Sequence, residues 1–296
     1  MSQVTCVVCG SQQLRLYLDD RTENFDSASF GSSRKAISHG RIMRCTQCGF
    51  GFRQERSTER EMAELYRRMD PRVYEAEAAG RARTAARHLR IVQRHQPPGR
   101  ILDVGCASGL FLKLAAGAGW AVEGIEPSET LHRTAAAALA GVGQVHCGTL
   151  EESGLAPGSF DAITIWDVLE HVPDPNGFLA RCRSLLRPEG RLYANVPNID
   201  SKEARLLGKR WPLLLAEHLN YFNRSSLTIC GQKAGLEWLS FGQRPSWFST
   251  GYIMYRLAQH KIPGSSFGSR LARGRLGKIA IPINLGEICA VGRRCS

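Results

Sequence analysis

The sequence contains no apolar run that approaches the roughly 20 residues needed to cross a bilayer. Its first residues, MSQVTCVVCG, lack the basic segment followed by an apolar core that marks a secretory signal. We therefore expect a cytoplasmic protein without a membrane span. Because that compartment is reducing, closely spaced cysteines are expected to bind metal rather than to form disulfides.

Acidic residues are few compared with basic ones. The chain has 27 Asp and Glu against 39 Lys and Arg, which gives a formal net charge of +12. Such an excess favours anionic partners, including RNA, phosphorylated metabolites and acidic glycans. The arginines are spread over expected helix faces and a basic tail, so a solvated basic surface explains the same composition.

Four of the ten cysteines form two CxxCG pairs, Cys6 with Cys9 and Cys45 with Cys48. Four thiolates at this spacing can surround one tetrahedral Zn²⁺ and leave no coordination position for water, so the metal would be structural. The segments LRLYL and ISHGRIMRC between the pairs read as strands. We predict a zinc ribbon over residues 1–56; the alternative is four buried cysteines without a ligand.

The rest of the chain divides at a proline-rich boundary. Residues 57–98 predict a helical linker or cap, in which Pro71 interrupts two helical stretches. The sequence PPGR then precedes the main domain, residues 99–296. Segments near 200–225 and 250–284 are expected to be lid insertions in this domain.

A short apolar strand and a glycine-rich turn open the main domain. ILDVGCASGLFL predicts a buried parallel strand, a turn bracketed by Gly105 and Gly109, and a helix. The next strand ends at Glu126, where α/β nucleotide-binding folds accept hydrogen bonds from ribose hydroxyls. The glycine spacing is GxxxG rather than GxGxxG, and a carboxylate at Asp103 would repel a pyrophosphate. These features argue against NAD and favour a ligand with a cationic group.

Several segments that follow in order give this chain a family resemblance. DVGCASG, EGIEPS, HCGTLEE, FDAITIWDVLEHVPDP and LLRPEGRLYANVPN resemble the successive motifs of class I S-adenosylmethionine-dependent methyltransferases. In HCGTLEE, Thr149 stands where the family more usually has an acidic residue. The resemblance implies S-adenosylmethionine as cofactor and contacts with it from residues of these motifs: Asp103, Gly105, Cys106, Gly109, Glu126, Thr149, Leu150, Trp166 and Asp167.

The pattern of strands predicts the fold class independently of the resemblance. Strands expected at 101–105, 121–126, about 143–147, 160–166 and 190–196 alternate with helical segments. The later runs GLEWLSFGQ and GEICAVGRR could add an antiparallel edge. We predict an α/β, Rossmann-like, mostly parallel seven-stranded sheet with helices on both faces.

The segment after the fourth of these strands carries the first group of candidate catalytic residues. If it forms a helical turn, Asp167, Glu170 and His171 lie on one side of it. His171 could be a general base oriented by Glu170, the three could hold a divalent ion, or they could only brace the loop. Ubiquinone-type O-methyltransferases carry a similar segment.

A second candidate base is His218 in the segment AEHLNYF, where Glu217, Asn220 and Tyr221 surround it with polar groups. The segment resembles one found in methyltransferases that carry a zinc head and act on sugars and other small hydroxylated acceptors. His171 and His218 remain unranked as bases.

These observations predict a methyltransferase that acts on a small hydroxylated acceptor. A sugar, sugar nucleotide or glycan or natural-product precursor is the expected acceptor, with an anionic one suited to the basic surface. O-methylation is favoured over C-methylation. One alternative is an RNA methyltransferase that binds RNA with the zinc ribbon and the basic surface, although the chain lacks the Asn/Asp-Pro-Pro-aromatic motif common to amino-methyltransferases of nucleic acids. The other is an interaction protein that binds the cofactor without catalysis.

Overall fold

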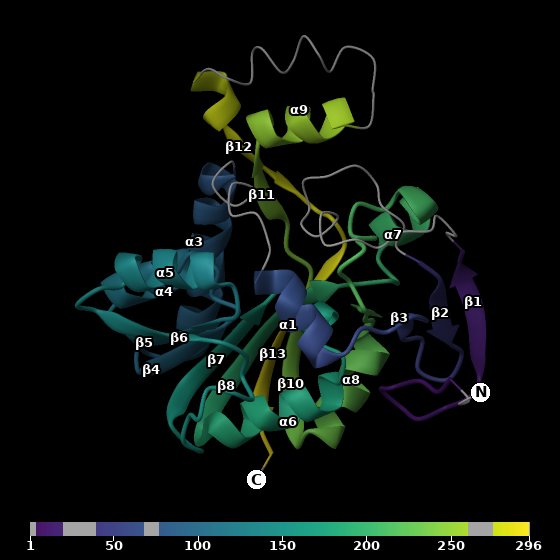
Figure 1. The fold of residues 1–296 in the computed structure, drawn as a ribbon, viewed down its shortest axis with the longest axis horizontal. Coiled ribbons are helices and arrows are strands. Elements are labelled where there is room, and N and C mark those ends of the chain that lie inside the picture. Colours follow the sequence, from purple (N-terminus) through teal and green to yellow (C-terminus); the bar gives the residue numbers. More distant parts are fainter. Residues whose placement is uncertain (1–3, 20–39, 68–76, 260–274, 296) are drawn as a thin grey trace.

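The computed structural model describes residues 4–19, 40–67, 77–259 and 275–295. A seven-stranded sheet with the order β10-β13-β8-β7-β4-β5-β6 forms its centre (Figure 1). The five strands from β8 to β6 are parallel, and β13 runs antiparallel to both of its neighbours. The strands are β4 (Arg100–Val104), β5 (Ala121–Glu126), β6 (Gly143–Cys147), β7 (Phe160–Trp166), β8 (Leu186–Pro197), β10 (Leu236–Gly242) and β13 (Glu287–Arg294). The predicted fold class and its antiparallel edge are confirmed.

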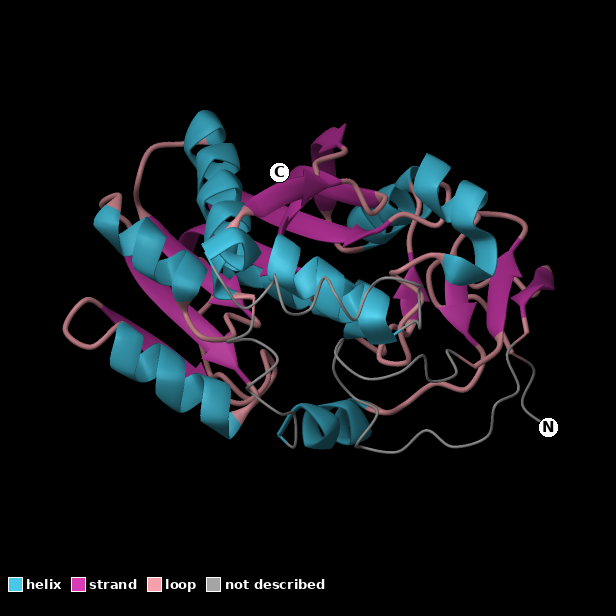
Figure 2. Ribbon diagram, turned by 90° about the horizontal axis from the view of Figure 1, so that it is seen from above, coloured by secondary structure: helices cyan, strands magenta, loops and turns pink. Residues whose placement is uncertain are grey.

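Helices cover both faces of this sheet (Figure 2). Ile101 of β4 packs into the apolar core under one set of helices, and its neighbour Leu102 packs into the core on the opposite face, as the alternation of a strand requires. The first set consists of α3 (Ala78–His95), α4 (Leu110–Gly117) and α5 (Glu129–Ala138), and the second of α6 (Pro175–Leu185) and α8 (Arg224–Lys233). The sheet is therefore buried between two helical layers.

The cysteine-rich head, which we define as residues 4–19 and 40–56, contributes three strands to a second sheet of order β1-β2-β3-β9. These strands are β1 (Leu14–Leu18), β2 (Ile42–Cys45), β3 (Gly51–Arg53) and β9 (Asn220–Tyr221). The fourth strand, β9, thus comes from the main domain, far downstream in the sequence, and begins two residues after His218. The sequence predicted strands in the head but not this pairing.

The two ranges that the sequence predicts to be lid insertions contain short helices and strands. The first contains α7 (Lys202–Leu207), the 3₁₀ turn η3 (Gly208–Arg210) and β9. The second contains α9 (Thr250–Gln259), η4 (Arg275–Lys278) and β12 (Ala280–Ile283), which pairs with β11 (Ser246–Ser249). Residues 260–274 of this insertion lie outside the described residues.

In the predicted linker, the described residues form α1 (Glu59–Arg67) and α3, whereas the expected break at Pro71 lies outside them. In the main sheet, β8 begins at Leu186 rather than at residue 190, because α6 ends directly before it.

Among the described helices, none is both long enough and apolar enough to cross a membrane.

Candidate functional site

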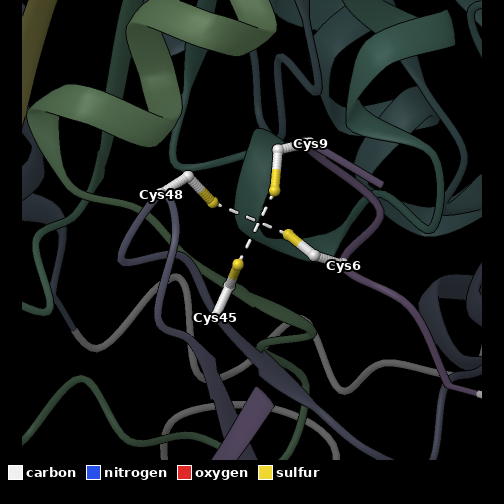
Figure 3. A group of neighbouring side chains, drawn as sticks. All are labelled: Cys6, Cys9, Cys45 and Cys48. Carbon is white, nitrogen blue, oxygen red and sulfur yellow. Dashed lines mark hydrogen bonds between the residues drawn. The ribbon is translucent and has the colours of Figure 1, made fainter. Parts of the chain in front are cut away.

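The four cysteines of the head point toward a common centre (Figure 3). The sulfur atoms of Cys6 and Cys48 are 3.7 Å apart, and those of Cys9 and Cys45 are 3.6 Å apart. All four sulfur atoms lie within 4.8 Å of one another. Four thiolates at a Zn–S distance of about 2.3 Å in a tetrahedron would be separated by about 3.8 Å, so the arrangement fits one zinc ion.

The glycine turn between β4 and α4 has the backbone geometry that its sequence predicts. Gly105 and Gly109 have φ angles of +74° and +76°, and Ala107 between them has a φ of +50°. The amides of Gly105 and Cys106 donate to the carbonyl of Ile125 at 2.8 and 3.0 Å, which ties the turn to the end of β5. A Cβ atom on Gly105 would come within 2.8 Å of a methyl group of a neighbouring valine, so the turn needs glycine there.

Two buried carboxyl groups flank this turn. Asp103 accepts a hydrogen bond from the Thr164 hydroxyl at 2.6 Å. Glu126 accepts one from the Ala107 amide and one from the Ser128 amide, both at 2.9 Å. Burial raises the pKa of Asp103 and of Glu126 to about 7. Both groups are therefore poised to ionise fully when a ligand supplies a positive charge or hydroxyl donors.

The remaining expected cofactor contacts lie around the same turn. Thr149 is half-buried, and its amide donates to Glu152 at 2.8 Å, while the next residue, Leu150, is buried. Trp166 stacks on His88 of α3 with ring centroids 3.9 Å apart and an interplanar angle of 13°. Its indole Nε1 is buried and has no hydrogen-bond partner among the described residues. The His88 stack was not anticipated, because nothing in the sequence pairs α3 with the end of β7.

Asp167 does not join Glu170 and His171 as the sequence predicted. It has a φ of +56°, and its carboxylate accepts from the side-chain amide of Asn195 at 2.7 Å. The segment after β7 forms a short 3₁₀ turn, η2 (Leu169–His171), rather than an α-helical turn, so the expected one-sided spacing does not apply.

Burial and the neighbouring Asp167 carboxylate raise the pKa of Glu287, a residue that the sequence did not single out, to about 8.

The structure instead brings His218 to Glu170 and His171. Possible ligand atoms of these three residues lie within 4.8 Å of one another, and the two imidazole rings are 4.8 Å apart between centroids. One carboxyl oxygen of Glu170 is buried without a hydrogen-bond partner among the described residues. The two candidate bases, far apart in the sequence, thus form one cluster.

The tautomers of both histidines follow from their neighbours. Nδ1 of His171 lies 3.0 Å from the carbonyl oxygen of Glu217, and Nδ1 of His218 lies 2.9 Å from that of Leu213. A carbonyl oxygen only accepts, so each Nδ1 carries the proton and each neutral ring keeps an unprotonated Nε2. Burial lowers the pKa of His171 to about 4 and the pKa of His218 well below its usual range, so both rings are neutral at pH 7.

One cavity of about 660 Å³ connects these groups. The glycine turn, Asp103, Glu126 and Thr149 line one part of it, and the histidine cluster lines another. The described residues around it include eight with carboxyl groups and one arginine, Arg81. Apolar side chains that the sequence did not single out form a further wall: Trp247, Phe248, Tyr252, Ile253, Ile283 and Leu285. They come from β11, α9, β12 and the loop that follows β12. In the sequence, nothing distinguishes these apolar residues from residues of a core.

Comparison with known proteins shows the family to which the chain belongs. Residues 74–240 match the family model described as a methyltransferase domain. The chain is 31% identical over 149 residues to the ubiquinone biosynthesis O-methyltransferase of Thiobacillus denitrificans, and 33% identical over 149 residues to that of Aromatoleum aromaticum. Each match covers 47% of this chain and 64% of the relative, so the similarity spans less than two thirds of the relatives' length.

Solved structures show the same fold at low sequence identity. A Bacillus halodurans protein assigned as a methyltransferase has a TM-score of 0.53 at 14% identity, with 72% of this chain and 99% of that one covered. An S-adenosylmethionine-dependent methyltransferase from Methanosarcina mazei has a TM-score of 0.50 at 17% identity, with 69% and 97% covered. The fold is the one found in these S-adenosylmethionine-dependent methyltransferases. The chain belongs to the methyltransferase domain family that its residues 74–240 match.

Proposed function

We propose that the protein transfers the methyl group of S-adenosylmethionine to a hydroxyl oxygen of a small, uncharged or cationic acceptor. The observation that carries this proposal is the shared cavity, in which the glycine turn and Glu126 share one space with two histidines whose Nε2 atoms are unprotonated. The relatives named for O-methylation support the oxygen as acceptor atom, while carbon remains the second candidate.

The residues around the glycine turn fit the cofactor. Both oxygens of Glu126 have lone pairs left after their amide contacts, so they can accept from a ribose diol. Asp103 supplies negative charge beside the turn, where the cationic methionine part would lie. Cys106, Gly109, Thr149, Leu150, Trp166 and Asp167 complete the proposed contacts, and all but Gly109 line the cavity. When bound, S-adenosylmethionine supplies a methyl group made electrophilic by its sulfonium sulfur.

The histidine cluster would act on the acceptor. Methyl transfer is an in-line displacement, so the protein mainly aligns donor and acceptor and removes the hydroxyl proton. The Nε2 atom of His171 or His218 would take that proton, and Glu170, whose pKa is raised by burial and by the Asp167 carboxylate, would orient the ring. The same three residues offer a carboxylate and two imidazoles to a divalent ion, which would lower the pKa of the hydroxyl instead.

The lining of the cavity indicates the acceptor class. The net charge of +12 suggested an anionic acceptor, but the described lining offers it one arginine beside eight carboxyl groups, of which Asp103, Glu126 and Glu287 have pKa values raised to about 7 or 8. A phosphorylated sugar would therefore find few cationic partners there. The aromatic and aliphatic wall around Trp247 and Tyr252 would pack against a ring or hydrocarbon portion. An uncharged hydroxylated ring compound satisfies both features, and an unphosphorylated sugar fits the wall less well.

Transfer of a radiolabelled methyl group into fractions of a host extract tests this function. The extract is divided into organic-extractable small molecules, water-soluble small molecules and RNA, and each reaction is repeated with a chelator after zinc retention has been verified. We expect label in the organic-extractable fraction. Label in phosphorylated water-soluble compounds would contradict the acceptor class, and label in RNA alone would contradict the function.

The head is proposed to hold one structural zinc ion through Cys6, Cys9, Cys45 and Cys48. The alternative of RNA methylation finds no support in the relatives reported above. A chain that binds the cofactor but labels no fraction would support the non-catalytic alternative.

A further inference from the structure

The cysteine-rich head is joined to the segment that carries His218. Strand β3 of the head pairs antiparallel with β9, placing Phe52 opposite Asn220. The amide of Arg53 donates to the carbonyl of Leu219 at 3.0 Å and so extends this pairing toward His218. The head therefore forms a continuous backbone connection with one wall of the cavity.

The side chain of Arg53 adds a second connection to this segment. Its Nη1 donates to the carbonyl of Ala216 at 2.5 Å, two residues before His218. The same guanidinium donates from Nε to the carbonyl of Glu55 and from Nη2 to the hydroxyl of Ser57. With 7% of its surface exposed, Arg53 joins the end of the head rigidly to the chain before His218.

Arg56 makes the corresponding connection to the His171 loop. Its Nη2 donates to the carbonyl of Pro173 at 2.6 Å and to the side-chain oxygen of Asn220 at 3.0 Å. The Asn220 amide in turn donates to the carbonyls of Leu169 and Val172 at 2.9 and 2.7 Å, on either side of His171. Arg56 and Asn220 thus hold the two histidine segments against each other.

The protonation pattern of the histidine cluster depends on this relative position. The His171 ring donates from Nδ1 to the carbonyl of Glu217, which belongs to the other segment. The amide of Leu219 donates to the carbonyl of Glu170 at 2.8 Å across the same junction. If the two segments separate, His171 loses the acceptor that keeps its proton on Nδ1. By contrast, the contacts of Asp103, Glu126 and the glycine turn are made within residues 102–168.

We propose that Arg53 and Arg56 are positioning residues through which the folded head sets the relative orientation of His171 and His218 and the tautomer of His171. The head then determines the geometry of the part of the cavity around Glu170, His171 and His218, which we call the acceptor half. It leaves unchanged the cofactor half, which is the part around the glycine turn, Asp103 and Glu126. This inference rests on the proposed function for its catalytic meaning, since it assigns the head a task in that reaction. Its geometry is measurable without any acceptor.

The test uses the full chain with zinc bound and compares Arg56→Met and Arg53→Met with Arg15→Met, a change at an exposed position of β1 in the same sheet. Nitrogen-15 NMR of the imidazole rings reports which ring nitrogen carries the proton. Hydrogen exchange reports the protection of the amides around residues 169–173 and 216–222. Calorimetry with S-adenosylhomocysteine reports the cofactor half, and zinc content is measured for every variant.

We expect Arg56→Met to shift the His171 signals away from the Nδ1-protonated form and to speed exchange in both segments at least about tenfold, because charged hydrogen bonds that hold them are lost. S-adenosylhomocysteine affinity should stay within about threefold, since its contacts are separate. Arg53→Met should affect mainly residues 216–222, and Arg15→Met should change neither readout.

Unchanged tautomers and exchange in folded, zinc-bound Arg56→Met and Arg53→Met would overturn the inference. Faster exchange that extends equally to β4 and β5 would overturn it as well, because the arginines would then support the whole fold. Imidazole NMR and hydrogen exchange do not involve methyl transfer. If the proposed function fails, the role of the two arginines can still be judged, and if that role fails, the proposed function is not affected.

Discussion

Replacement of Glu126 by Gln tests the assignment of the cofactor half of the cavity. In the structure, each carboxyl oxygen of Glu126 accepts one backbone amide, from Ala107 and from Ser128 at 2.9 Å. Gln keeps the size of the side chain but turns one of these oxygens into an NH₂ group, which cannot accept. The variant therefore loses the charge, one amide contact in the turn and at least one acceptor for a ribose hydroxyl.

The expected loss follows from the strength of these bonds. A hydrogen bond to a charged group contributes about 1.5–3 kcal/mol, and each 1.4 kcal/mol changes an equilibrium constant about tenfold. Loss of one such bond to the cofactor therefore predicts a dissociation constant about 10- to 100-fold higher. Calorimetry with S-adenosylmethionine measures this constant, with circular dichroism as a check on folding. A folded Glu126→Gln variant that binds within about threefold of the wild type would refute the assignment.

Four further outcomes are expected. His171→Ala and His218→Ala should keep cofactor affinity and lower turnover about 100-fold or more, which is the usual contribution of a general base. Calorimetry measures the affinity and radiolabel transfer measures the turnover. Loss of cofactor binding in both variants would contradict their catalytic roles. Affinity for S-adenosylmethionine should rise between pH 6 and 8, by about tenfold for each of Asp103 and Glu126, because each pKa near 7 is raised in the free protein and the ionised form binds. By the same linkage, these two carboxyl groups make the free protein less stable as the pH rises from about 4 to about 7, since they ionise first in the unfolded state. Calorimetry measures the affinity and thermal unfolding measures the stability; a flat pH profile of either quantity contradicts the corresponding prediction. Gly105→Ala should weaken cofactor binding, because its φ is +74° and the new Cβ would meet a valine methyl at 2.8 Å, and unchanged affinity would show that the turn can relax.

The central sheet was predictable because its signals are local. The apolar strand before Gly105 and the acidic end of the next strand at Glu126 predicted both the elements and their places in the cavity. The antiparallel edge was also predictable, since GEICAVGRR is apolar enough for a strand buried inside the sheet. The paired CxxCG spacing similarly predicted that four distant thiols would converge.

The acceptor half could not be predicted as well from the sequence, because its arrangement depends on pairing between distant segments. Spacing placed Asp167 with Glu170 and His171, but the chain forms a 3₁₀ turn there and Asp167 turns to Asn195. The segment that brings His218 to His171 continues into β9, which pairs with the head, and a two-residue strand leaves no periodic pattern. The net charge sums over the whole chain, so it does not report the eight carboxyl groups among the described residues that line the cavity.

A single-turnover experiment tests the central claim most directly. Protein loaded with radiolabelled S-adenosylmethionine is mixed with the small-molecule extract, and the wild type is compared with the His171→Ala, His218→Ala double variant at equal cofactor occupancy. The account predicts that the wild type transfers its label to an organic-extractable product, while the double variant retains its label on the cofactor. Equal transfer by both proteins would contradict the claim that the cavity pairs a cofactor half with a histidine-based acceptor half.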